Sequence, residues 1–174
     1  KGWNWKRPYG LPALDNEPVV HINFNEAENY CKWNKKRIPT IKEWELAAYT
    51  EFRMNNKDGY KFKKSYPYPT GENTLGLNCL NDCNFNYPSK YSKFLLRGYG
   101  HVSTSSTKKG VNGLYDMGGN VWEWVDINDN SYKGTKGGSW WYGKNQMIQG
   151  YNAIKPKNMS AVYIGFRCVK DFKN

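Results

Sequence analysis

Histidine, acidic residues and long apolar runs are scarce in this chain of 174 residues. Only His21 and His101 are present, and neither has the spacing to a cysteine that zinc sites use. No segment reaches the ~18 consecutive apolar residues of a membrane-spanning helix, so we expect no membrane span. Fifteen acidic residues stand against 26 basic ones, which gives a net charge of +11. This excess favours an acidic partner, either a protein surface or a polymer.

The positive charge consists mostly of dispersed lysines rather than clustered arginines. Its densest stretch is 57–64, where four lysines alternate with aromatic residues. No nucleic-acid-binding motif accompanies this stretch. We therefore expect a protein or acidic polymer partner and do not expect nucleic acid.

Aromatic residues are abundant, at 17% of the chain, and 17 glycines and 8 prolines accompany them. A disordered chain is poor in aromatic residues, and so many turn-forming residues argue against a helical bundle. The length suits one domain. We predict a single α+β domain over residues 1–174, rich in loops, with two short helices and several short strands.

Capping signals and apolar patterns predict the positions of these elements. The first helix is predicted to start at Asn25 with Glu28 completing a capping box, and the second at Thr40 with Glu43. Strands are predicted for three apolar or glycine-flanked segments, and a mostly irregular region separates the helices from the last two strands. These segments are 19–24, 134–142 and 160–169, and the irregular region is 53–110.

Four cysteines occur in the chain, an even count that suggests disulfides and an oxidising compartment. Of the three possible pairings, we favour a local Cys79–Cys83 bridge together with a long-range bridge between Cys31 and Cys168. We therefore expect an exported protein, located in a periplasm, at a cell surface or outside the cell.

Four segments in one order make the sequence recognisable. The first, 18–31, begins PVVH and ends Tyr30-Cys31, and the second, 36–48, contains KRIPT and EWELAA. The third is GLYDMGGNVWEW at 113–124, and the fourth combines GGSW at 137–140 with IGFRC at 164–168. In this order the chain resembles the formylglycine-generating enzyme family, also called sulfatase-modifying factors, over almost its whole length.

The resemblance implies a loop-rich fold related to C-type lectins, with disulfides and calcium. It also implies a bridge between Cys31 and Cys168. The N-terminal segment usual in the family is absent from this sequence, and we expect either that it was removed or that a second chain supplies it. An open sheet edge is expected if the segment is missing.

A calcium site is implied by the 113–124 stretch. By position the family's ligands map onto the carboxylates of Asp116 and Glu123 and the carbonyls of Gly119 and Val121. Calcium takes hard oxygen ligands of these kinds. The alternative is that Asp116 and Glu123 are loop carboxylates held by backbone N–H groups.

The family enzyme oxidises a substrate cysteine to formylglycine with copper and dioxygen, and two cysteines hold Cu(I). The corresponding positions here are Tyr142 and Met147. Thiolates suit Cu(I), and one thioether does not replace two thiolates. The sequence therefore disfavours copper and formylglycine formation, and we assign no catalytic residue.

Three functions remain under the resemblance. The first is a non-catalytic binding or assembly module, with an aromatic ligand groove at Trp140, Trp141, Tyr142 and Met147. The second is a divergent oxidative enzyme, although two histidines are too few for the three-histidine iron site of the related ergothioneine synthases. The third is a calcium-dependent, carbohydrate-binding lectin-like module. We assign Arg167 a structural role.

Overall fold

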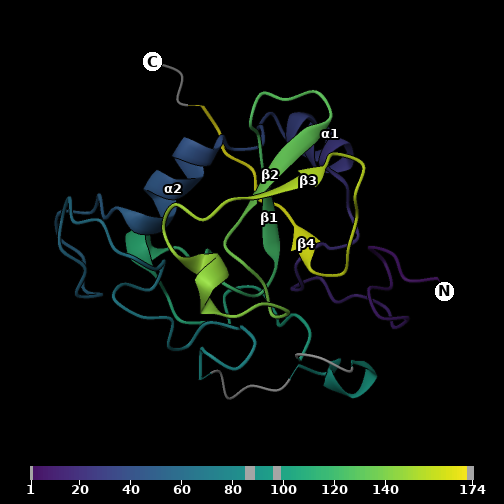
Figure 1. Ribbon diagram of the computed structural model, residues 1–174, viewed down its shortest axis with the longest axis horizontal. Helices are drawn as coiled ribbons and strands as arrows, with labels where there is room; N and C mark the ends of the chain where they lie inside the picture. The colour runs from purple at the N-terminus through teal and green to yellow at the C-terminus, as the bar shows by residue number, and fades with distance from the viewer. Residues whose placement is uncertain (1, 85–88, 96–98, 172–174) are drawn as a thin grey trace.

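The computed structural model describes residues 2–84, 89–95 and 99–171 (Figure 1). It contains two α-helices, three short 3-10 helices and four short strands, and this mixture confirms the α+β class. The α-helices are α1 (Phe24–Trp33) and α2 (Ile41–Tyr49). The strands are β1 (Trp122–Val125), β2 (Tyr132–Lys136), β3 (Ala153–Pro156) and β4 (Ile164–Gly165). The 3-10 helices are η1 (Ser92–Phe94), η2 (Val111–Gly113) and η3 (Lys144–Met147).

The strands form one mixed sheet in the order β3-β2-β1-β4. β2 pairs antiparallel with both β1 and β3, whereas β4 runs parallel to β1. The strand predicted for 134–142 is found at Tyr132–Lys136, so it begins two residues earlier and ends where Gly137 and Gly138 adopt positive φ angles. The strand predicted for 160–169 is limited to Ile164–Gly165. Figure 1 shows the sheet near the centre of the molecule, with α1 and α2 on different sides of it and long loops extending beyond them.

The first helix starts two residues earlier than the sequence suggested. Asn23, not Asn25, is the N-cap: its side chain accepts from the backbone N–H of Glu26, and the Glu26 carboxylate accepts from the backbone N–H of Asn23. Starting here buries Phe24. The hydrophobic core therefore selects between two equivalent capping signals.

The second helix starts as predicted. Thr40 caps it and Glu43 completes the capping box. On its inner face Trp44 and Ala48 are buried, as the helical spacing suggested.

The strand predicted for 19–24 is wrong. Within the described residues no strand pairs with this segment, and His21 adopts φ +57, which is incompatible with an extended strand. The segment instead lies against β4, so closely that a Cβ on Gly165 would lie 2.5 Å from the Val19 carbonyl oxygen. The apolar pattern therefore indicated that residues of this segment, such as Val20 and Phe24, are buried, and not that the segment pairs as a strand.

Both predicted disulfides are present. One joins Cys31 in α1 to Cys168 just after β4, and the other joins Cys79 to Cys83. The latter lies within the long region between α2 and β1, which is mostly irregular as predicted. The Cys31 bridge belongs to the core between α1 and the sheet, whose other buried members are Phe24, Ala27, Ile38, Trp122, Trp124 and Ile164.

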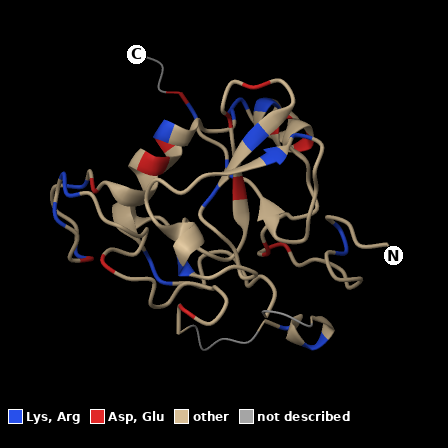
Figure 2. Ribbon diagram, viewed as in Figure 1, with Lys and Arg blue, Asp and Glu red and all other residues tan. Residues whose placement is uncertain are grey.

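The distribution of basic residues and the length of the helices agree with the expectations from the sequence. Lys and Arg segments are spread over helices, strands and loops rather than gathered on one element (Figure 2). Among the described residues, no helix has the length and apolar character needed to cross a membrane.

Candidate functional site

Glu123 on β1 is the most heavily hydrogen-bonded of the predicted site residues. Arg167, just after β4, donates from Nε to Oε2 at 2.6 Å and from its terminal nitrogen to Oε1 at 2.5 Å. Trp44 of α2 donates from Nε1 to Oε2 at 2.7 Å. Burial alone would lower the pKa of Arg167, but the charge of Glu123, its hydrogen bonds and the charge of Asp116 together outweigh burial and raise that pKa. This ion pair therefore ties β4 to β1 and α2.

Asp116 lies on the turn before β1. Its Oδ1 accepts from the Thr107 hydroxyl at 2.6 Å and its Oδ2 from the Ser105 backbone N–H at 2.7 Å. The turn passes very close to another loop at Gly119, where a Cβ would lie 2.4 Å from the Asn78 carbonyl oxygen, at φ +71. Glycine is required at this position because of both the contact and the backbone conformation.

A cavity of about 830 Å³ brings several of these residues together. We call it the β4-side cavity. Its lining includes Asp116, Val121, Glu123 and Arg167, the exposed apolar residues Trp5, Val19 and Tyr30, and the acidic residues Glu17 and Glu26. Its size lies within the range of ligand pockets, roughly 300–1,000 Å³.

The calcium prediction can be compared with this geometry. Asp116 and Glu123 line the same cavity, but each accepts hydrogen bonds from protein donors. Arg167 already supplies a positive charge at Glu123, so a dication there would face guanidinium repulsion. Within the described residues, no three His, Cys, Asp or Glu side chains gather into a metal-binding group. We assign Glu123 to the ion pair with Arg167, and the calcium site stays a prediction.

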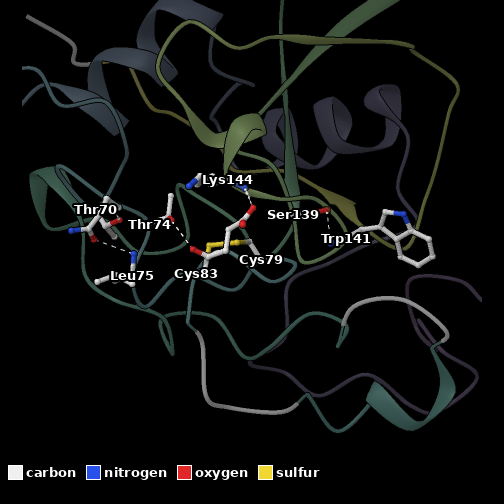
Figure 3. The surroundings of a disulfide bond; sticks show 10 residues. Thr70, Thr74, Leu75, Cys79, Cys83, Ser139, Trp141 and Lys144 are labelled. Atoms are coloured by element: carbon white, nitrogen blue, oxygen red, sulfur yellow. Dashed lines mark hydrogen bonds between the residues drawn. A yellow bond between two sulfur atoms is a disulfide. The ribbon is translucent and has the colours of Figure 1, made fainter.

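Both positions that correspond to the copper-binding cysteines carry packed side chains. Met147 is fully buried and packs with Leu77 and the Cys79–Cys83 disulfide. Tyr142 is half-buried, with its ring 5.5 Å from that of Trp122. Figure 3 shows the disulfide loop beside the segment that carries Ser139, Trp141 and Lys144.

Hydrogen bonds connect these two loops. The Leu80 N–H donates to the Tyr142 carbonyl, and the Lys144 N–H donates to Asp82 Oδ2. The disulfide loop thus covers the segment in which the family places its cysteines. All four cysteines of the chain are in disulfides, so the chain offers no thiol there.

The predicted aromatic groove is divided between interior and surface. Trp140 is 1% exposed and Met147 is buried, so neither contributes to a surface. Trp141 and Tyr142 are half-buried, and both rings lie near Tyr163, that of Trp141 tilted at 6.1 Å and that of Tyr142 edge-on at 5.7 Å. The four residues do not form one exposed aromatic surface.

Sequence reasoning missed a second polar cluster. Glu17 and His101 are 84 residues apart, yet His101 Nε2 lies 3.5 Å from Glu17 Oε2 inside the protein. No motif links these two residues in the sequence. Their loop positions follow from long-range packing, so no local signal could have paired them.

Comparison with known proteins places the chain in a family. The model of the sulfatase-modifying factor enzyme 1-like domain matches residues 1–172. A formylglycine-generating enzyme of Streptomyces coelicolor is 32% identical over 71% of this chain and 38% of its own length. The bovine (Bos taurus) "Inactive C-alpha-formylglycine-generating enzyme 2" is 35% identical over 78% of this chain and 44% of its own length. The chain thus spans less than half the length of these two curated relatives.

Solved structures share the fold. The crystal structure of CarF covers 94% of this chain and 72% of its own, with a TM-score of 0.64 and 18% identity. PvdO from Pseudomonas aeruginosa covers 90% of this chain and 64% of its own, with a TM-score of 0.62 and 19% identity. The fold, the ordered motifs and the match over residues 1–172 agree, and the chain belongs to the sulfatase-modifying factor family.

Proposed function

We propose that this domain does not form formylglycine and instead acts as an exported binding or assembly module. The observation that carries the proposal is the state of its sulfur atoms. All four cysteines are in disulfides, and Met147 is buried against one of them. Binding of Cu(I) in this family needs two thiolates, and a disulfide sulfur is no substitute for a thiolate.

Two relatives support a non-catalytic role. The bovine and mouse (Mus musculus) proteins named "Inactive C-alpha-formylglycine-generating enzyme 2" are 35% and 34% identical to this chain over their matched regions. The family therefore includes proteins described as inactive. Similarity to the active enzymes is comparable, so the proposal rests on the cysteines rather than on identity.

Export is the second part of the proposal. The Cys31–Cys168 bridge lies within the core, and such structural disulfides persist in oxidising compartments. Tightly packed disulfides of this kind suit a protein outside the cytosol.

The binding surface we propose is the β4-side cavity, and the occupant we propose is an extended segment of another protein chain. Trp5, Val19 and Tyr30 are exposed at the cavity by 53, 42 and 52%. Glu26 and Asp116 also line it, and Asp116 interacts electrostatically with Arg167. An occupant with alternating apolar and basic side chains matches both properties.

The charge of this surface differs from the charge of the whole chain. The whole chain carries +11 and attracts acidic surfaces at long range. The cavity itself is lined by Glu17, Glu26, Asp116 and Glu123, against the cations Lys36 and Arg167. Local chemistry therefore favours basic side chains at the point of contact.

The test is a formylglycine assay. The purified domain, with copper and dioxygen supplied, is incubated with cysteine-containing peptides, and the Streptomyces coelicolor relative serves as the active control. Mass spectrometry should detect formylglycine only with the control. Formylglycine produced by this chain, and lost when Met147 is replaced, would overturn the proposal.

A further inference from the structure

Soon after α2 the chain makes an excursion over residues 52–64, which we call the lysine loop. The loop contains five basic residues and one acidic residue. All of its residues are described, and none of them lines the β4-side cavity. Figure 1 shows the loop beyond α2 at the left edge of the molecule, and Figure 2 shows blue segments along it. This surface is therefore separate from the site described above.

Hydrogen bonds hold the lysine loop in one shape. At its base, the Glu51 N–H donates to the Lys64 carbonyl at 3.0 Å, and the Lys63 N–H donates to the Glu51 carbonyl at 2.7 Å. Inside the loop, Asn56 Nδ2 donates to the Tyr60 carbonyl at 2.7 Å, and Asn56 Oδ1 accepts from the Tyr60 N–H at 3.2 Å. A partner therefore binds a preorganised surface and avoids the entropic cost of ordering a flexible segment.

The acidic side chains of this region are neutralised within the protein. Glu51 is fully buried, and its two carboxylate oxygens accept from the Arg53 guanidinium at 2.8 and 2.9 Å. Asp58 pairs with Arg53 at 2.7 Å and with Lys109 at 3.3 Å. These carboxylates therefore offer little negative charge to a partner of the loop.

Three lysines of the loop keep their charge available to a partner. Lys57, Lys61 and Lys63 are exposed, and none of them forms an ion pair with a residue that the structure describes. Lys63 Nζ lies 5.3 Å from the centre of the Phe62 ring. Cationic and apolar groups therefore occupy the same stretch of surface.

Large apolar side chains are also exposed on the lysine loop. Phe52, Met54 and Phe62 are 52, 74 and 42% exposed. Phe52 follows Glu51 and Phe62 precedes Lys63, the two residues whose backbone bond closes the loop. Single exposed apolar residues are ordinary on a protein surface, but three of them on one ordered loop, among unpaired lysines, indicate an interaction surface.

The combination of charge and apolar side chains decides which partner fits. A soluble acidic polymer would neutralise the lysines but leave the three apolar side chains in water. At an anionic bilayer, headgroup phosphates attract the lysines, and apolar side chains enter the boundary between headgroups and acyl chains. We propose that the lysine loop docks this domain on the surface of an anionic phospholipid bilayer. This docking does not rest on the proposed binding of a protein segment in the β4-side cavity.

The experiment measures co-sedimentation of the purified wild-type protein with lipid vesicles. Vesicles of phosphatidylcholine with about 30% phosphatidylglycerol are compared with vesicles of phosphatidylcholine alone. We expect at least about tenfold tighter binding to the anionic vesicles. Binding should weaken at about 0.5 M salt, because the ions screen the lysines. No binding to the anionic vesicles would overturn the proposal.

A charge variant tests whether the loop or the net charge of the protein is responsible. It combines three substitutions, Lys57→Gln, Lys61→Gln and Lys63→Gln. Each lysine near an anionic surface strengthens binding about fivefold, so the variant should bind at least about tenfold more weakly. The control removes the same charge with Lys35→Gln, Lys42→Gln and Lys170→Gln. These control lysines are exposed and lie near the start of α2, at the end away from the loop. An equal loss in the control would overturn the proposal.

An apolar variant distinguishes a bilayer from any other acidic surface. It combines Phe52→Ser, Met54→Ser and Phe62→Ser, and we expect at least about tenfold weaker binding to the anionic vesicles. Trp33→Ser is the control, because Trp33 is 78% exposed on α1, and it should bind as the wild type does. The replaced side chains are exposed, so thermal unfolding should show folded proteins throughout. Vesicle binding that survives in the apolar variant would overturn the proposal, because charge alone would then explain it.

Discussion

The two edges of the sheet are built differently. β3 forms one edge, pairs with β2 over four residue positions, and carries Lys155 and Pro156. β4 forms the other edge and pairs with β1 at only two positions, and neither of its residues is charged or proline. Lysine and proline are common devices against unwanted strand pairing. The β3 edge is protected in this way, whereas both residues of β4 are buried and the Val19 backbone packs against Gly165.

The short β4 strand depends on bonds outside the sheet. Just beyond its end, Arg167 pairs with Glu123 and Cys168 is bridged to Cys31. The difference between the edges teaches that the β3 edge relies on lysine and proline, whereas the buried β4 edge is held by a disulfide, an ion pair and the chain that packs against it at Val19. Each of the following predictions perturbs one of these restraints.

The largest effect is expected from the disulfide beside β4. The Cys31–Cys168 bridge joins residues 137 apart and Cys79–Cys83 joins residues 4 apart. Chain entropy then predicts losses of about 5 and about 2 kcal/mol when each pair is replaced by serine. Urea unfolding of the two double variants measures both values. Equal losses would show that the β4 side is not specially dependent on its bridge.

The second largest loss of stability is expected when the ion pair beside β4 is removed. Arg167→Met leaves the Glu123 carboxylate, 6% exposed, without its cation, and we expect a loss of about 3 kcal/mol in urea unfolding. Arg37→Met is the matched control. Arg37 pairs with Glu43 and Asp171, which are 40 and 70% exposed, so its loss should be about 1 kcal/mol or less. A similar loss in both variants would contradict a special role for Arg167.

Low pH should reduce the stability that Glu17 contributes to the folded protein. Burial opposes ionisation there, but His101, Lys90 and Tyr91 lower the pKa of Glu17 to about 2. A lowered carboxylate pKa contributes stability at pH values above the ordinary pKa of 4.5, and that stability is lost as the pH falls toward 2. The free energy of unfolding should therefore fall across this window.

Two variants identify the source of that loss. Glu43 also has a pKa of about 2, mainly through its bond to Arg37, but its side chain is 40% exposed, whereas that of Glu17 is 5% exposed. Glu17→Gln should flatten the pH dependence more than Glu43→Gln does. The opposite order would show that the buried cluster contributes little.

The smallest effect is expected at the helix that carries Cys31. Asn23→Ala removes the N-cap of α1 and should cost about 1 kcal/mol. Asn25→Ala is the control and should cost less than about 0.5 kcal/mol, because Asn25 is exposed inside the first turn. Thermal unfolding of both variants checks the position of the cap.

Local capping signals predicted the start of the second helix correctly and placed the start of the first helix two residues too late. Thr40 and Glu43 form the capping box that the sequence indicated. Asn23 and Asn25 are each followed by glutamate three residues later, so the capping signal alone could not choose between them. Burial of Phe24 makes the choice, and that depends on the sheet.

Only those residues of the candidate site that lie within recognisable motifs could be predicted from the sequence. The ordered motifs gave the family and the residues Asp116 and Glu123 of the β4-side cavity, and the number and spacing of the cysteines gave both disulfides. They did not give the pairing of Arg167 with Glu123, 44 residues apart, or of His101 with Glu17. Such contacts are set by how long loops pack, and loops leave little periodic signal in a sequence.

The most direct test of the binding role compares the two sheet edges with displayed peptides. Random 12-residue peptides are selected on the wild-type domain and then measured on two variants. Val19→Arg adds a cation at the β4-side cavity, and Ile154→Arg adds one at β3, where Ile154 is 55% exposed. We predict basic, partly apolar peptides that bind Ile154→Arg normally and Val19→Arg at least about tenfold more weakly, a difference of ~1.4 kcal/mol. Peptides that bind both variants equally, or no selected peptide at all, would contradict a binding role for the β4-side cavity.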